Sequence, residues 1–318
     1  MKRPFFIVLL LGLLFSLQPL WACDLCSIYS SNHATAQSGQ GFYLGAAEQY
    51  SPFGTLQQDG HKVPNPTGQY MNSSISQMFL GYNVNSRVGV QLTVPVIYRT
   101  FRRPVGNAIQ QGSVGGFGDS SIVAKVNALQ KLSEDFNFNW GFVGGIKLPT
   151  GSSSRLREEL FETEDEGGEE SGVHGHDLTL GSGSFDGIVG SNLNLRWHRF
   201  LFSGDVQYAI RSRGSFGYRF ANDLHWNAAM GGYLLLNHTL TLALQGQTAG
   251  ETKGLDNLNG VPSTDTGITS VYLGPRVLFT YKEHLSFTAA GDIPILQNNT
   301  ALQTVPDYRV RSAVTWAF

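Results

Sequence analysis

Beyond residue 40, apolar and polar residues alternate in segments of about ten to twelve residues, the length of a membrane-spanning strand. Between positions 87 and 99, the even positions are apolar or aromatic, whereas the odd positions are mostly polar or small. Side chains of a strand point to its two faces in turn, so this period of two predicts a strand with one apolar face. The same pattern recurs in 136–148, 200–211, 238–247 and 308–318.

The connections between the predicted strands alternate in length. Those after the even-numbered strands are short, whereas those after the odd-numbered strands are long, and the longest is 149–183. Outer-membrane barrels have short periplasmic turns, long outer loops and aromatic rings at both ends of the lipid-facing band. Tyr98, Trp197 and Trp316 stand at such strand ends. We expect strands near 41–51, 69–83, 87–99, 117–129, 136–148, 184–197, 199–211, 222–236, 238–249, 268–282, 284–295 and 307–318.

These features predict an all-β fold, a transmembrane antiparallel up-and-down β-barrel of about twelve strands. Closure leaves no unpaired backbone groups facing lipid, where each would be costly. A secreted two-sheet sandwich also alternates, but sandwiches rarely show such regular long and short connections. Phe318 lies in the last predicted strand and resembles the C-terminal aromatic by which the barrel-assembly machinery recognises its clients. Four prolines are expected towards the outer rim, where strand ladders tolerate interruption: Pro95, Pro149, Pro275 and Pro294.

Composition excludes several other classes of protein. Only 14% of the 318 residues are charged, against roughly 25% in ordinary soluble domains. Past the N-terminus there is no apolar run of about 18 residues, which argues against a polytopic helical membrane protein. The net charge of −2 gives no basic surface for nucleic acid, and 2 Cys cannot form a disulfide-rich scaffold.

The N-terminus predicts export from the cytoplasm. Residues 1–22 combine Lys2 and Arg3 with a short apolar run and a small residue, Ala22, before Cys23, as in a secretory signal peptide. We therefore expect three parts: the signal peptide 1–22, a periplasmic segment 23–40 at or inside the barrel mouth, and the barrel 41–318 with an acidic outer loop 149–183. The predicted location is the outer membrane of a Gram-negative bacterium.

Cys23 and Cys26 form a C-x-x-C pair at the expected mature terminus. In an oxidising compartment the two thiols can form a disulfide or remain free, and this is our default. A metal site that also uses His33 and an acylated Cys23 are the alternatives. Covalent haem attachment is excluded because Ser27, not His, follows Cys26.

If the apolar faces contact lipid, the opposite faces line the lumen. Charge there is net basic, and two interpretations remain open: a mixed or weakly anion-selective pore, or cross-lumen ion pairs that fill a narrow barrel. The predicted lumen-lining charges are Arg99, Asp119, Lys125, Lys147, Arg196, Asp205, Arg211, Arg276, Asp292, Arg309 and Arg311.

The longest loop carries an acidic run from Glu158 to Glu170, followed by His174, His176 and Asp177. Imidazoles and carboxylates together can bind divalent cations, so these three residues are a candidate metal site. A charge-rich stretch broken by glycines is more typical of a solvated mobile loop, which is the interpretation we favour. A third possibility is that the loop folds inward and narrows the pore.

Three glycine-containing stretches resemble a known family. They are Gly116–Asp119 (G-F-G-D), Gly145–Gly151 (ending in K-L-P-T-G) and Leu180–Asp186 (L-G-S-G-S-F-D). In this order they resemble the outer-membrane family linked to the meta-cleavage pathway of phenol degradation. The resemblance is close over about 116–190 and implies a barrel transporter for hydrophobic compounds such as aromatic hydrocarbons. It brings no catalytic residues and no cofactor.

The leading functional hypothesis is a monomeric outer-membrane channel through which a small, hydrophobic or aromatic solute diffuses passively. A non-conducting surface barrel that binds cations or partners through its acidic loop is the alternative. An outer-membrane hydrolase is the third hypothesis, with Ser30, Ser31 and His33 as its nearest candidates, but no G-x-S-x-G or H-E-x-x-H motif is present. The expected partners are outer-membrane lipids, the barrel-assembly machinery and the solute.

Overall fold

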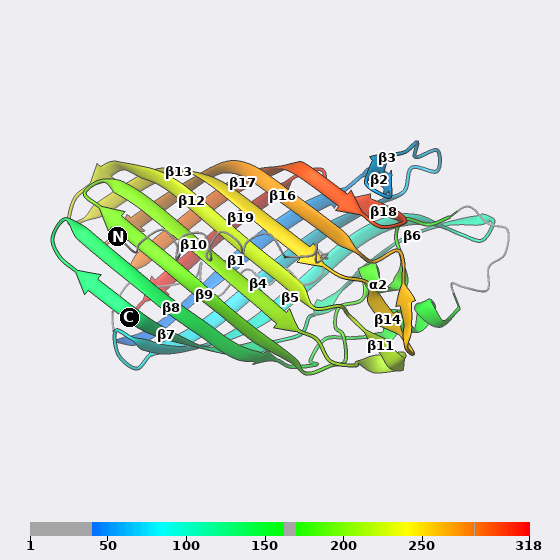
Figure 1. Ribbon diagram of the computed structural model, residues 1–318, viewed down its shortest axis with the longest axis horizontal. Helices are drawn as coiled ribbons and strands as arrows, with labels where there is room; N and C mark the ends of the chain where they lie inside the picture. The colour runs from blue at the N-terminus through cyan, green and yellow to red at the C-terminus, as the bar shows by residue number, and fades with distance from the viewer. Residues whose placement is uncertain (1–39, 162–169, 283) are drawn as a thin grey trace, which may run out of the picture.

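A computed structural model describes residues 40–161, 170–282 and 284–318, and these residues form one long barrel (Figure 1). The main sheet runs in the order β4-β1-β19-β17-β16-β13-β12-β10-β9-β8-β7-β5-β6, and the β4–β5 pairing closes it. Strands run obliquely to the long axis, with the short turns at one end and the long loops at the other (Figure 1). The wall strands are β1 (Gly41–Phe53), β4 (Tyr70–Asn83), β5 (Val88–Val105), β7 (Ser121–Leu132), β8 (Phe136–Lys147), β9 (Asp186–Trp197), β10 (Phe200–Ile210), β12 (Asp223–Leu236), β13 (Leu240–Lys253), β16 (Ile268–Tyr281), β17 (Leu285–Asn299) and β19 (Arg309–Ala317).

The prediction of a closed antiparallel barrel of about twelve strands is confirmed. β6 (Ala108–Phe117) is not counted as a separate strand of the wall. It pairs with the half of β5 nearest the long loops, and the polypeptide then continues into β7, which pairs with the half of β5 nearest the short turns. Phe318 follows β19 directly, and its backbone N–H donates to the carbonyl of Phe42 at 3.0 Å. The C-terminal residue is thereby joined to the first strand.

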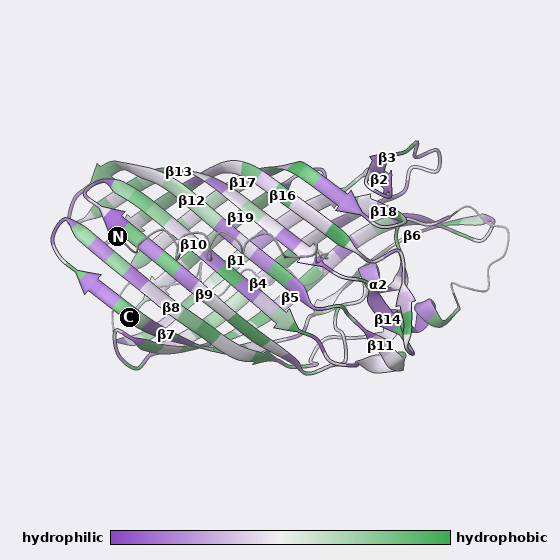
Figure 2. Ribbon diagram, in the orientation of Figure 1, coloured by the Kyte–Doolittle hydropathy of each residue, from purple (hydrophilic) through white to green (hydrophobic). Residues whose placement is uncertain are grey.

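The outer surface of the wall is apolar, as the alternation predicts. Leu44, Leu80, Leu92, Ile122 and Ile146 are partners in register across β1, β4, β5, β7 and β8, and all five are exposed. Figure 2 shows hydrophobic residues alternating with hydrophilic ones along these strands. In water such a belt would be unfavourable, whereas in a bilayer it contacts acyl chains.

Two of the four prolines lie in the middle of the wall, not at the rim as expected. Pro95 lies where β5 changes its neighbour from β7 to β6, and its carbonyl accepts the N–H of Gly118 at 2.9 Å. Pro275 lies where the β16–β17 ladder is interrupted between Leu273 and Arg276. Proline has no N–H to donate, so it is tolerated where the ladder already lacks a bond.

The long connections at the outer end carry structure of their own. One three-stranded sheet is formed by β11 (Tyr218–Arg219), β14 (Asp256–Leu258) and β15 (Val261–Ser263), and another by β18 (Leu302–Val305), β2 (Thr55–Gln58) and β3 (His61–Lys62). The connection after β8 holds η2 (Ser154–Leu160) and α2 (Gly175–Leu178), and η4 (Ser215–Gly217) follows β10. In the part of the chain that the structure describes, none of the helices is long and apolar enough to cross a membrane.

We predict that Leu92→Arg destabilises the barrel in lipid by about 2–4 kcal/mol, the cost of a cation near the bilayer midplane on the lipid face. Leu92 lies near the middle of the lipid-facing stretch 88–98. The measurement is reversible unfolding in lipid vesicles, with Leu92→Ala as the control for lost packing. An equal effect of the two substitutions would show that this face does not contact lipid.

Candidate functional site

The lumen is divided into two halves of different character. The half next to the short turns encloses a cavity of about 650 Å³, lined by inward-facing residues and by the turns at 85–87 and 237–239. The other half, below the long loops, is filled by ion pairs and by part of the connection 148–185. The predicted lumen charges are distributed over both halves.

Four of the predicted residues line the cavity: Lys125, Arg196, Asp205 and Arg276. They lie on β7, β9, β10 and β16, so they approach the cavity from different parts of the wall. Nη1 of Arg276 lies 3.4 Å from the hydroxyl oxygen of Ser203 on β10, so its side chain reaches across β13 and β12. Charged and polar groups therefore surround this space.

In the filled half, one ion pair joins strands that are not neighbours in the wall. Arg309 on β19 pairs with Glu251 on β13, although two strands lie between them in the wall. The guanidinium of Arg309 also lies 3.8 Å from the ring centroid of Tyr272, whose hydroxyl donates to Glu251 at 3.2 Å. Next to this group, Arg311 pairs with Asp292. These contacts pair the buried charges of this half of the lumen, which is how buried charges are tolerated.

A second network of ion pairs, a series of neighbouring charged side chains, runs along the wall at its outer end. Lys147 pairs with Asp119 and, at 2.9 Å, with Asp186, and Asp186 also pairs with Arg211 at 2.9 Å. The series of ion pairs continues with Asp223, which pairs with Arg211. His225 extends it, 3.3 Å from Asp223. Acidic and basic groups thus alternate across β8, β9, β10 and β12, so each charge has an opposite neighbour.

The three motifs that carry the family resemblance meet at one end of this network. The Asp119 carboxylate accepts the N–H of Gly151 at 3.0 Å and the N–H of Ser182 at 2.9 Å. A Cβ on Gly151 would lie 2.6 Å from the carbonyl of Leu180, and one on Gly181 would lie 2.5 Å from the Asp119 carboxylate. Glycine is therefore needed where these backbones touch. The motif residues join both ends of the long loop to the wall, a role that their spacing alone does not reveal.

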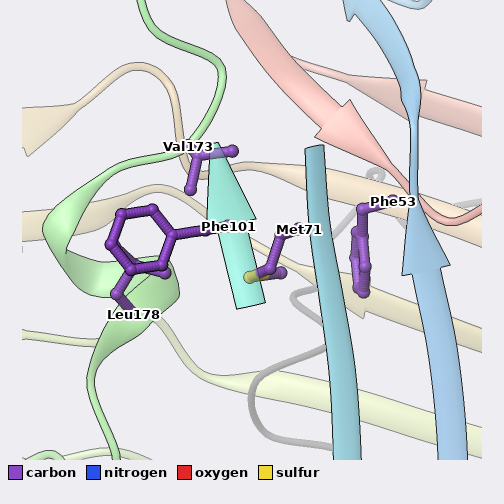
Figure 3. Packing of buried hydrophobic residues seen from close by; sticks show 5 residues of the cluster. All are labelled: Phe53, Met71, Phe101, Val173 and Leu178. Atoms are coloured by element: carbon purple, nitrogen blue, oxygen red, sulfur yellow. The ribbon is translucent and has the colours of Figure 1, made fainter. Parts of the chain in front are cut away.

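Residues 171–183 of this loop are mostly buried in the barrel mouth, so the favoured expectation of a solvated mobile loop is wrong for this part of it. Val173 and Leu178 are fully buried and pack against Phe53, Met71 and Phe101 of the wall (Figure 3). We call residues 170–182 the plug. The inward-folding alternative is the one observed, because these apolar residues are removed from water only inside the mouth.

Two wall arginines hold the plug in place. Arg99 is buried and donates to the carbonyl of Thr179 at 2.6 Å. Arg103 donates to the carbonyl of Val173 at 3.4 Å and pairs with Glu158 at 2.6 Å. Arg99, predicted to line the lumen, therefore contacts the plug and not an open pore.

His174, His176 and Asp177 join the plug to the other outer loops. His176 Nδ1 lies 3.0 Å from Glu159, and its ring stacks on those of His174 and Tyr218 at 5.5 and 6.1 Å. His174 Nε2 lies 3.3 Å from Asp265, while Asp177 accepts the backbone N–H of His174 at 2.9 Å. Among the described residues, no group of three or more His, Cys, Asp or Glu side chains is arranged to hold a metal ion. The cation site thus stays a sequence prediction without a geometric counterpart.

The pKa of His176 responds to its surroundings in two opposing ways. Burial lowers the pKa, but the carboxylates of Asp177 and Glu159 outweigh burial and hold it well above the usual 6.5. The protonated imidazolium is therefore the stable form inside the plug, where it binds two acidic side chains.

Several predictions fall on residues that the structure does not describe. The signal peptide 1–22, the segment 23–39 with Cys23 and Cys26, the residues Ser30–His33 and the acidic stretch 162–169 all lie outside the described residues.

No family model and no curated protein sequence matches the chain. Among solved structures, it is similar to an outer membrane channel from Pseudomonas putida F1, with a TM-score of 0.57 and 15% identity over 88% of this chain and 96% of that chain. It is also similar to the translocator domain of the autotransporter NalP from Neisseria meningitidis, with a TM-score of 0.42 and 12% identity over 91% and 92%. The first likeness shows a shared outer-membrane barrel fold, and it agrees with the apolar outer belt in locating the protein in the outer membrane.

We predict that alkaline pH loosens the plug. His176 has a raised pKa in the folded protein, so its stabilising effect is complete below pH 6.5 and is lost as the pH rises through the raised pKa. Amide hydrogen exchange at 173–178, corrected for the intrinsic rate, should accelerate over that interval in the native protein. Over the same pH range, the corrected exchange rate of His176→Gln should stay unchanged. Equal acceleration of exchange in the two proteins would contradict this role of His176.

Proposed function

We propose that this protein is an outer-membrane channel for small solutes. The observation that carries the proposal is the cavity of about 650 Å³ inside a closed barrel whose outer surface is apolar. A barrel that served only as a surface scaffold would not need polar residues around a space of this size. Ligand cavities commonly measure about 300–1,000 Å³, so the space suits a small molecule.

The route of the solute follows from the two halves of the lumen. The cavity is bordered by residues of the short turns, including Asn85, Arg87 and His238, so it faces the periplasmic side. Towards the outside, the plug and the pairs Arg309–Glu251 and Arg311–Asp292 lie in the way. Passage therefore requires the plug to move, the ion pairs narrow the space that remains, and channel opening is part of the proposal.

The family resemblance supports the same function. The motifs at 116–119, 145–151 and 180–186 are the ones that bind the long loop to the wall, so they serve the plug and not a reaction. We therefore propose membership of the phenol meta-pathway outer-membrane family and a non-enzymatic role. One observation favours the alternative of a surface barrel that does not conduct. The outer half of the lumen is filled by the plug and by ion pairs.

We predict that expelling the plug increases conductance. Leu178→Glu places a charge against Phe53, Met71 and Phe101, where burial without a partner is unfavourable, while the ion pairs of the wall stay intact. In planar bilayers this variant should conduct several times more than the native protein. Phe161→Glu is the matched control, since Phe161 lies on the same connection with an exposed ring, and it should behave like the native protein.

Absence of conductance in the native protein and in Leu178→Glu, together with no solute flux in liposomes, would overturn the channel function. The barrel-forming ability of each variant is checked first by heat-modifiable migration in gels.

A further inference from the structure

The charge around the cavity has the opposite sign to the charge of the whole chain. Among the residues that the structure describes, its lining holds the cations Arg87, Lys125, Arg196, Arg276 and Lys282, and Asp205 as the one carboxylate. The whole chain has a formal net charge of −2. A space with low-dielectric walls concentrates the field of such charges, so anions are favoured over cations in this cavity.

Lys125 is the cation best placed to receive a ligand. Its ammonium group has no hydrogen-bond or ion-pair partner within the described residues, unlike Lys147 higher in the lumen. On β5 its register partner is Gly89, which has no side chain, and on β8 its register partner is Val143, whose side chain is apolar. Arg276 lies on the opposite wall, because five strands separate β7 from β16 in either direction.

A row of amides crosses the same part of the wall, five positions from Lys125 along β7. Gln130, Asn139 and Asn194 are register partners across β7, β8 and β9, and all three line the cavity. The buried Asn139 Oδ1 has no hydrogen-bond partner within the described residues. A side-chain amide donates two hydrogen bonds and accepts others, so a row of amides matches a series of hydroxyl groups.

These observations together point to one class of ligand. We propose that the cavity binds small hydroxylated carboxylates of the sugar-acid type, with the carboxylate at Lys125 and the hydroxyls on the amide row Gln130–Asn139–Asn194. This inference rests on the proposed channel function, and the cargo that it names differs from the hydrophobic compounds that the family resemblance implies. A hydrocarbon would remove water from Lys125 and the amides without replacing their hydrogen bonds, which is unfavourable. A simple inorganic anion would leave the amide row unused.

The test measures binding separately from transport. The mature protein in detergent is titrated calorimetrically with D-gluconate, with sorbitol as the neutral analogue of the same chain length, and with benzoate as an apolar carboxylate. The expected order of affinity is gluconate first, with sorbitol and benzoate each weaker, since sorbitol lacks the carboxylate and benzoate lacks the hydroxyls.

Two variants assign the contacts. Lys125→Gln should weaken gluconate binding by about 10-fold or more, the range for hydrogen bonds to a charged group, and should leave sorbitol unchanged. The double variant N139A/N194A should weaken gluconate and sorbitol and leave benzoate unchanged. Lys131→Gln is the matched control, because Lys131 lies on the same strand with an exposed side chain that does not line the cavity, and it should bind like the native protein.

Tighter binding of benzoate than of gluconate, or gluconate binding that Lys125→Gln leaves unchanged, would overturn the ligand class. Failure of the channel function is a different result, namely gluconate binding in detergent without conductance or flux in lipid. Arg276→Gln is a second variant on the opposite wall for the case that Lys125→Gln does not form a barrel, and it should weaken gluconate more than sorbitol.

Discussion

A bilayer offers no hydrogen-bond partner to a backbone amide, so every membrane-spanning strand of this chain has to find both of its neighbours within the protein. The β4–β5 pairing supplies the closure that this condition demands. Once the sheet is closed, its two faces meet different surroundings. One face contacts lipid and is covered by residues such as Leu80 and Leu92, and the other encloses a space too narrow to behave as bulk water.

Enclosure explains why the charges inside the barrel are arranged in pairs. A lone ion removed from water is costly, and its neighbour of opposite sign offsets that cost only at close range. The network from Asp119 through Lys147, Asp186 and Arg211 to Asp223 satisfies this condition along the wall, and Arg309 with Glu251 satisfies it across the lumen. Lys125 differs because it borders the cavity, where a solute can provide the missing charge.

The plug is held both by apolar packing against the barrel wall and by the charged side chains inside the barrel. Its apolar residues, Val173 and Leu178, are buried against the wall, and its backbone carbonyls accept hydrogen bonds from Arg99 and Arg103. Ser182 at its end hydrogen-bonds Asp119, which also pairs with Lys147. The wall charges that satisfy one another therefore also anchor the segment that covers the mouth, and a change in the plug affects the same network that lines the lumen.

The sequence by itself determined the twelve strands of the wall and the faces that their residues occupy, because a period of two is a local property of each segment. It also separated the short-turn end from the loop end. It did not reveal β6 or the short strands of the outer loops. Other features depended on closure: Arg309 and Glu251 are 58 positions apart, and Ser182 and Asp119 are 63 apart. The inward folding of the long loop and the place of Lys125 at the cavity likewise followed from contacts between distant segments. Only the tertiary structure decided these features, since no periodicity states which residues face each other across an enclosed space.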